Sequence, residues 1–159
     1  MNWQSAFLAQ ARAEYAILQM LIGHEDVPVC HKLHYLQMVS EKVAKGLSTA
    51  PDSKPPPVHR ALVRFIQSAA DVKTLMRACG FVRRSAYRSY LRSMLPLADQ
   101  IERLAPESSA RQPNPEYPWQ PIGGDDPIVP ADHGFPEFDF RNRDMLRLLS
   151  FPQICLQLS

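Results

Sequence analysis

The clearest indication of the fold class of this chain comes from residues 31–47, HKLHYLQMVSEKVAKGL. Apolar residues recur at helical spacing along one flank, with Ser40 interrupting the row: Leu33, Leu36, Val43 and Leu47. The other side is polar and carries Gln37, Glu41, Lys42 and Lys45. Glu41 precedes Lys45 by about one helical turn, so the two can form an ion pair worth about 0.2–0.5 kcal/mol. The pattern predicts an amphipathic helix that faces a helical core.

Similar periodicity predicts further helices over residues 3–22, 58–70, 73–78, 81–104 and 144–158. Two of them carry rows expected to face inward: Trp3, Phe7, Ala11, Leu18 and Ile22, then Val82, Ala86, Tyr90, Met94, Leu97, Ile101 and Leu104. Because proline lacks an amide donor, we expect a kink or break at Pro96 and a break at Pro152. The predicted fold class is all-α, an up-and-down bundle of about four to five main helices in one domain over residues 1–159.

Residues 106–136 carry eight prolines and three glycines, a composition that excludes a regular helix. Large apolar side chains are nevertheless present there, among them Ile122 and Phe135. A loop of this length usually packs on its domain or has a function. We therefore expect a long proline-rich loop before the last helix, a strap over residues 106–140 that lies on the bundle and is anchored by Tyr117-Pro118-Trp119.

The net charge of +2 conceals an uneven distribution. From Lys54 to Arg92 there are nine Lys and Arg residues against one acid, Asp71, a local balance of +8. From Asp99 to Asp139 there are nine acids against two arginines, a balance of −7. We favour the interpretation that the acidic segment folds over the basic one. The alternative is a basic surface that binds an anion, with nucleic acid the obvious candidate.

Several classes of protein are disfavoured by what the sequence lacks. No run approaches the roughly 18 apolar residues that a transmembrane helix needs, and the N-terminus has no basic region typical of a secretory signal. The three cysteines are far apart and odd in number, which indicates free thiols and a cytoplasmic location: Cys30, Cys79 and Cys155. Glycine-rich phosphate loops and G-x-S-x-G elbows are missing, which disfavours P-loop phosphoryl transfer and serine hydrolysis.

Basic residues near the middle of the chain are the candidates for binding. Three arginines spaced by four share one face of the expected 81–104 helix, with a tyrosine nearby, and two more arginines lie in the expected 58–70 helix. Arginine can hold a phosphate bidentately, and an aromatic ring can stack on a base. A solvated face or salt bridges to the acidic segment remain the favoured explanation. The candidate binding residues are Arg60, Arg64, Arg84, Tyr87, Arg88 and Arg92.

Metal-binding side chains also occur in the 31–47 region. Cys30, His34 and Glu41 share a side of the helix, His31 lies beside them, and His59 could supply a further ligand. Patterns such as C-x-x-C or H-E-x-x-H are missing from the sequence. We favour structural roles for these residues and expect neither a metal nor a cofactor.

The 31–47 helix, with its Glu41-Lys42-x-x-Lys45 pattern, resembles the second helix of the HEPN family of small all-helical prokaryotic proteins. The loop Pro55-Pro56-Pro57 that leads to His59 also has a counterpart in that family. The resemblance implies a helical bundle that self-associates as a dimer. HEPN ribonucleases use an Arg followed four to six residues later by His near the start of the last helix, and this chain lacks that motif.

The resemblance therefore implies a non-catalytic protein that binds a protein partner or RNA, as an accessory of a prokaryotic defence or toxin–antitoxin system. One alternative is a metal-independent ribonuclease with a displaced site, for which His59, His133 and Arg141 are the weak candidates for catalytic residues. A second alternative is an unrelated helical domain that binds other proteins.

Overall fold

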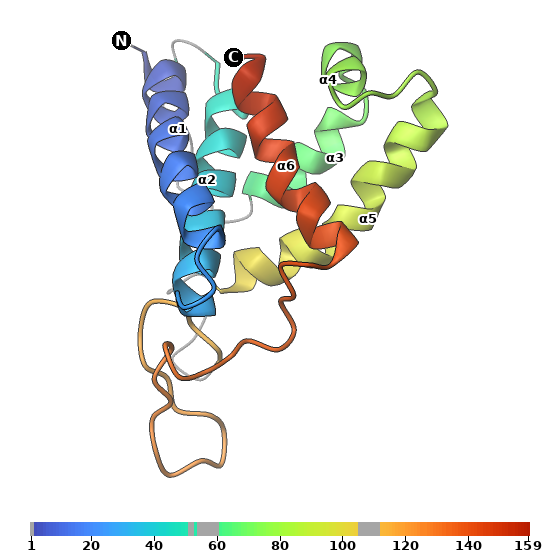
Figure 1. Cartoon of the computed structure of the whole chain (residues 1–159). Helices are drawn as coiled ribbons and strands as arrows, with labels where there is room; N and C mark the ends of the chain where they lie inside the picture. Colours follow the sequence, from blue (N-terminus) through green and yellow to red (C-terminus); the bar gives the residue numbers. More distant parts are fainter. Residues whose placement is uncertain (1, 51–52, 54–60, 105–111) are drawn as a thin grey trace.

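The computed structural model describes residues 2–50, 53, 61–104 and 112–159, and it is all-helical within these ranges. Figure 1 shows the arrangement of its helices, and the described residues contain no strand beyond an isolated bridge between Trp119 and Ile128. The all-α prediction is confirmed at this level. None of the helices in these ranges is long and apolar enough to cross a membrane. The helices are α1 (Trp3–Ile22), α2 (Val29–Ser48), α3 (Ala61–Ala69), α4 (Lys73–Ala78), α5 (Arg84–Arg103) and α6 (Arg143–Gln157).

Helices α1 and α2 form an antiparallel pair joined by a short turn (Figure 1). Asn2 caps α1 by accepting a hydrogen bond from the Ser5 amide at 2.8 Å. A Cβ atom on Gly46 of α2 would lie 2.8 Å from Leu8 Cγ, so glycine permits the close approach of the two helices there. Trp3, expected to face the core, is 48% exposed.

The polar side of α2 is divided between solvent and the α1 interface. Lys42 Nζ lies 2.9 Å from Glu14 Oε1 of α1, and Glu41 pairs with Lys45 within α2. Gln37, predicted to lie on the polar side, is instead buried, because α2 is covered on more than one flank. The amphipathic pattern thus predicts the helix correctly and underestimates how much of it is enclosed.

Helix α6 contacts α1 and α2 as well as α4 and α5. It therefore connects the α1–α2 pair with the helices in the middle of the chain. It continues through Pro152, so the break expected at this proline is wrong. Proline costs one helical hydrogen bond, and the burial of apolar residues on both sides of it offsets that loss. Helix α5 likewise continues through Pro96. The buried residues of α6 are Met145, Leu148, Leu149, Phe151, Pro152, Cys155 and Leu156.

Helix α3 is attached to α5 by a carboxylate. Glu102 Oε1 accepts hydrogen bonds from the amides of Leu62 at 2.7 Å and Val63 at 3.4 Å. Both amides belong to the beginning of the described part of α3. Glu102 therefore joins the last turn of α5 to the backbone of α3.

The buried face of α5 differs from the predicted row at its beginning. Val82 is 92% exposed and Ala86 is also exposed, whereas Tyr87 and Leu91 are buried. The prediction is wrong there because α5 begins only at Arg84, so Val82 belongs to the preceding turn and does not share the helical phase. Further along the helix, Met94 and the remaining core residues Ala98 and Ile101 are buried.

Residues 112–139, which we call the acidic lobe, form no helix or named strand and lie beyond the α1–α2 turn at one end of the molecule (Figure 1). Trp119 is 3% exposed, with its ring centroid 5.9 Å from that of the buried Phe135. Tyr117, expected to share in anchoring the segment, is 58% exposed. The lobe is thus organised around its own aromatic contacts.

Candidate binding surface

Seven Lys and Arg residues gather on α3, on α4, at the end of the turn that follows α4 and on the first half of α5, and we call this region the basic end. Between residues 61 and 92 the only acid is Asp71, which gives a local balance of seven minus one, or +6. The seven side chains are all exposed: Arg64, Lys73, Arg77, Arg83, Arg84, Arg88 and Arg92.

A tight turn after α4 brings these residues together. Gly80 has φ +79°, and the amides of Gly80 and Phe81 donate to the carbonyls of Arg77 and Met76 at 2.9 and 3.0 Å. This is a Schellman arrangement, in which glycine takes the left-handed conformation that closes a helix. Phe81 then packs on Tyr87, with ring centroids 5.7 Å apart. The chain consequently reverses, and the start of α5 lies beside α4.

Asp71 partly neutralises the basic end. Its carboxylate pairs with Arg84 and, at 3.1 Å, with Arg88. Hydrogen bonds from Arg84 and then Arg88 lower the pKa of Asp71 below its ordinary value. One carboxylate thus serves two of the arginines that lie on one face of α5, which relieves part of their mutual repulsion.

The other cations of the basic end have no carboxylate partner within the described parts of the chain. Arg92 Nε donates to the Arg88 carbonyl at 3.4 Å, and no ion pair is formed there by the remaining four: Arg64, Lys73, Arg77 and Arg83. Their charge is left to solvent or to a partner molecule.

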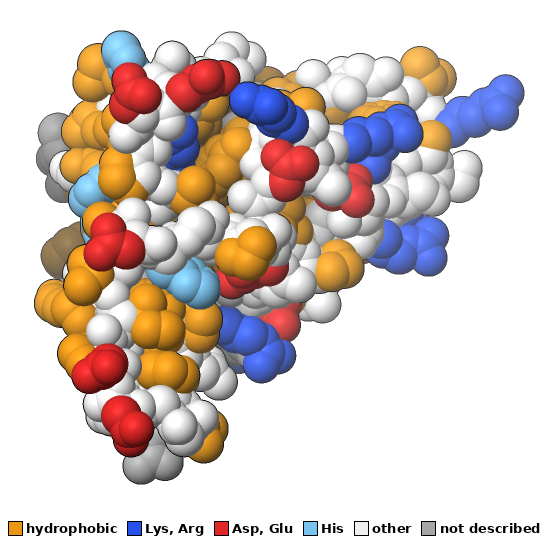
Figure 2. Space-filling model, turned by 60° about the horizontal axis from the view of Figure 1, so that its bottom comes forward, with side chains coloured by type: hydrophobic (Ala, Val, Ile, Leu, Met, Phe, Trp, Pro, Cys, Tyr) orange, Lys and Arg blue, Asp and Glu red, His pale blue; other side chains and the backbone are white. Residues whose placement is uncertain are grey.

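The favoured expectation, that the acidic segment folds over the basic one, is wrong for the described residues. The acidic lobe lies at the bottom of Figure 1, whereas α4 and the start of α5 lie at the upper right. Figure 2, which brings the bottom forward, shows several Lys and Arg side chains at the right edge and acidic side chains at the lower left. The lobe is tied instead to α2, where Glu116 Oε1 lies 2.9 Å from His34 Nδ1.

Tyr87 is placed incorrectly in the candidate binding set. Its side chain is 0% exposed and packs against Phe81 and Tyr90, so its ring cannot stack on a base. Burial raises the pKa of its phenol, with Cys79 contributing further. Tyr87 is close to the arginines in sequence. Its side chain, however, lies on the opposite, core-facing side of α5.

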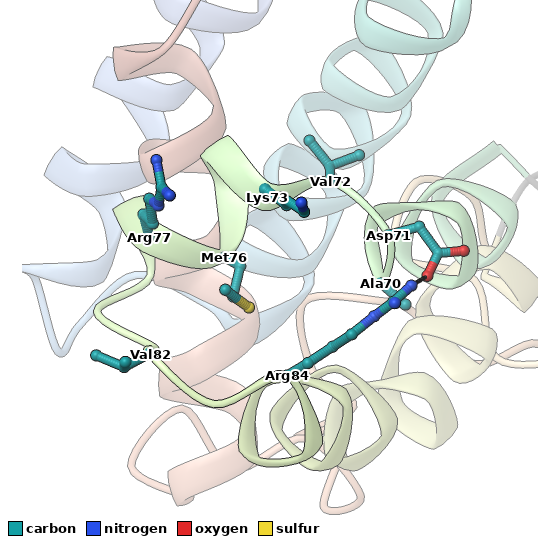
Figure 3. Close-up of a pocket in the computed structure, with 8 residues that line it drawn as sticks. All are labelled: Ala70, Asp71, Val72, Lys73, Met76, Arg77, Val82 and Arg84. Carbon is teal, nitrogen blue, oxygen red and sulfur yellow. Dashed lines mark hydrogen bonds and ion pairs between the residues drawn. The ribbon is translucent and has the colours of Figure 1, made fainter.

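A surface hollow of about 360 Å³ opens between α4 and the start of α5 (Figure 3). We call it the α4 hollow. Its walls include Val72, Met76 and Val82, and its rim carries Lys73 and Arg77. Arg84, paired with Asp71, closes one side (Figure 3). The combination of apolar walls and cationic rim suits a ligand that is apolar at its centre and negatively charged around it.

The weak catalytic candidates are held in separate contacts. The ring of His133 packs edge-on against Trp119 at 5.1 Å and Phe135 at 4.7 Å. Arg141 pairs with Glu25 of the α1–α2 turn at 3.1 Å. His59 and Arg60 lie outside the described residues. No described contact joins His133 to Arg141.

The potential metal ligands of α2 are likewise engaged elsewhere. His34 lies against Glu116 of the acidic lobe, and Glu41 pairs with Lys45. Among the residues that the structure describes, no group of three or more His, Cys, Asp or Glu side chains is arranged to hold a metal ion.

The cysteines are free thiols. Burial raises the pKa of Cys79 to about 11 and raises the pKa of Cys155 further in the same direction. A thiol with a raised pKa carries little thiolate at neutral pH and is a poor nucleophile. Cys79 and Cys155 both lie close enough to Tyr87 to raise its pKa, so they belong to the same enclosed region.

Comparison with known proteins does not assign the chain to a family. No protein-family model matches the chain, and neither a curated protein nor a solved structure is detectably similar to it. The HEPN resemblance of residues 31–47 therefore stays a prediction.

The sequence did not identify Lys73, Arg77, Val72 or Val82 as candidate binding residues, although all four line the α4 hollow. The charge count over residues 54–92 includes both cations, so it did signal the region. Nothing in the periodicity identifies the two valines as exposed, because Val82 fits a helical row that begins one turn too early.

Proposed function

We propose that this protein is a non-catalytic helical module that binds RNA through the basic end. The observation that carries the proposal is the set of seven exposed cations faced by a single carboxylate, Asp71. A surface that keeps such an excess unneutralised attracts polyanions, since each phosphate contact releases counterions into solution.

The buried position of Tyr87 limits how the RNA is contacted. Base stacking on this ring is excluded, and the exposed groups of the basic end are guanidinium and ammonium donors. Such donors hold phosphate oxygens and carry no direct sequence information. The binding we propose is therefore largely independent of sequence and strongly dependent on salt.

The test is a titration of a labelled single-stranded oligoribonucleotide at several salt concentrations. Replacing Arg84, Arg88 and Arg92 by glutamine should weaken binding by about 10²-fold at low salt. The slope of log K against log salt should fall by about 2, because each phosphate contact to a single strand contributes about 0.7. The matched control removes three arginines outside the basic end: Arg103, Arg141 and Arg143.

A triple variant of the basic end that binds as tightly as the control variant, with the same salt slope, would refute the proposal. Circular dichroism of both variants checks that the helices remain folded. Exposed positions were chosen for all six substitutions so that the core is not disturbed.

The absence of catalysis is tested separately by incubating the protein with total RNA in the presence of a chelator. We expect no cleavage, since His133 and Arg141 have other partners. Cleavage that disappears in His133→Ala would favour the metal-independent ribonuclease instead. The role in a prokaryotic defence or toxin–antitoxin system rests on the HEPN resemblance alone and stays a prediction.

A further inference from the structure

The acidic lobe ends in a well-formed turn that presents an apolar side chain. Trp119 and Ile128 pair through two backbone hydrogen bonds of 3.2 and 2.8 Å, which close a small loop between them. At its tip the Gly124 amide donates to the Pro121 carbonyl at 3.0 Å, and Gly123 has φ +79°. These features define a type II-like turn with Ile122 at its second position.

Ile122 is 84% exposed at this tip. The loop is held by Gln120, whose side-chain amide donates to the carbonyls of Gly124 at 2.9 Å and Asp125 at 3.2 Å. Asp125 and its neighbour Asp126 follow immediately and are exposed. The tip therefore displays one branched apolar side chain beside two carboxylates on an organised backbone.

The α4 hollow has the opposite character. Its walls are apolar and partly exposed, with Val72 at 43% and Val82 at 92%. Lys73 and Arg77 lie on its rim and have no carboxylate partner among the described residues. An apolar knob flanked by carboxylates is therefore complementary to this hollow in both polarity and charge.

The charge balance supports the same pairing over a wider area. The acidic lobe carries six acids and no Lys or Arg, a balance of −6, against +6 for residues 61–92. Within one molecule the two regions lie at opposite ends (Figure 1), so the lobe of a chain does not reach its own hollow. A second copy of the chain can supply what the first lacks.

We propose that copies of this protein associate head to tail, with the Ile122 tip of one copy seated in the α4 hollow of the next and Asp125 and Asp126 facing Lys73 and Arg77. The contact joins two different surfaces, so a pair of copies still has one free Ile122 tip and one free α4 hollow. Such heterologous contacts extend into rings or open chains instead of stopping at a symmetric dimer. The proposal shares the basic end with RNA binding but does not depend on it.

The experiment is sedimentation of the full chain over a range of concentrations at low salt. We expect the average mass of the wild type to rise beyond that of a dimer and to fall when salt is added, because salt screens the paired charges. Ile122→Ser should weaken association about tenfold or more, as removal of a central apolar anchor does. Val129→Ser, which removes another exposed apolar side chain of the lobe, is the matched control.

Charge reversal gives the sharper test. A hollow variant, Lys73→Glu with Arg77→Glu, and a tip variant, Asp125→Lys with Asp126→Lys, should each be monomeric alone. When the two are mixed, association should return, because each reversed surface now meets a complementary one. Asp132→Lys with Glu137→Lys reverses two charges elsewhere in the lobe and should leave wild-type association largely intact.

A wild type that remains monomeric up to about 1 mM would overturn the proposal, since a contact weaker than this contributes little. A dimer that neither reversal disrupts, or reversals that fail to restore each other, would overturn it as well. RNA titration of Ile122→Ser keeps the two proposals apart. At protein concentrations below those at which the chains associate, its affinity for RNA should match that of the wild type.

Discussion

The α1–α2 pair and the basic end use similar charged residues in opposite ways. In the pair, Lys42 lies 2.9 Å from Glu14 of the neighbouring helix, and both side chains are at most 17% exposed. In the basic end, Arg84 and Arg88 share one carboxylate and their neighbours have none among the described residues. Charges of the first kind join two helices, whereas charges of the second kind stay exposed to solvent, where we propose that RNA binds. The predictions that follow test this distinction.

The largest expected effect concerns the attachment of the basic end to the core. Glu102→Ala removes the acceptor for the amides of Leu62 and Val63. Two donors near the start of α3 then lose a charged partner, and we expect the free energy of unfolding to fall by about 2–3 kcal/mol. Urea denaturation followed by circular dichroism measures the loss.

Glu102→Gln is the control for this substitution, because it keeps an acceptor oxygen and loses only the charge. It should recover about half of the stability. If Glu102→Ala proves as stable as the wild type, the position of α3 is set by its apolar face alone. That outcome would show that the Glu102 carboxylate has no structural role to contrast with the exposed cations nearby.

A smaller loss is expected within the α1–α2 pair. Glu14→Gln leaves Lys42 without its partner across the helices, and we expect destabilisation of about 1–2 kcal/mol. Lys42 is not completely enclosed, and its ammonium can shift toward water, which limits the cost. A double-mutant cycle with Lys42→Met isolates the interaction energy between the two side chains.

An interaction energy near zero in this cycle would show that the Lys42–Glu14 pair stabilises the protein no more than an ordinary surface ion pair does. The contrast between the two regions would then rest on charge balance alone. RNA affinity is the second measurement, and neither substitution in the α1–α2 pair should change it, because both positions lie outside the basic end.

These examples also show how far the sequence predicts the molecule. The 31–47 helix, its Glu41–Lys45 pair and the inward residues of α3 follow from helical periodicity alone, because amphipathic rows depend on local spacing. The hydrogen bond from the Leu62 amide to Glu102 joins residues that are 40 positions apart, and no local pattern predicts such a contact. The phase of α5 was wrong at Val82 because the Gly80 turn, not the apolar row, determines where the helix begins.

The candidate site was predictable in composition and not in arrangement. Counting charges identified the basic stretch of residues 54–92 and the acidic one after it. Whether opposite charges neutralise each other within a chain depends on where the lobe lies, and that is set by the contact of Glu116 with His34 and by the aromatic contacts of Trp119. Charge counts alone favoured the wrong outcome.

The smallest expected effect separates charge from structure inside the basic end itself. Asp71→Asn removes the only carboxylate there while keeping a side chain of similar shape. Arg84 and Arg88 are then free to bind phosphate, so we expect RNA affinity to rise about two- to fivefold with little change in thermal stability. Asp99→Asn, which removes the partner of Arg103 at the other end of α5, is the control and should leave RNA affinity unchanged.

The pH dependence of this effect follows from the lowered pKa of Asp71. The carboxylate of the folded protein stays ionised at the ordinary aspartate pKa of about 3.9, so the affinity ratio of Asp71→Asn to wild type should be constant as pH falls from 8 to about 4. A group whose pKa is lowered by folding stabilises the folded state above its unfolded pKa, about 3.9 for aspartate, and this contribution disappears as pH falls through the folded value. An affinity ratio that declines with a midpoint at about pH 3.9 or above would show that Arg84 and Arg88 do not lower the pKa of Asp71.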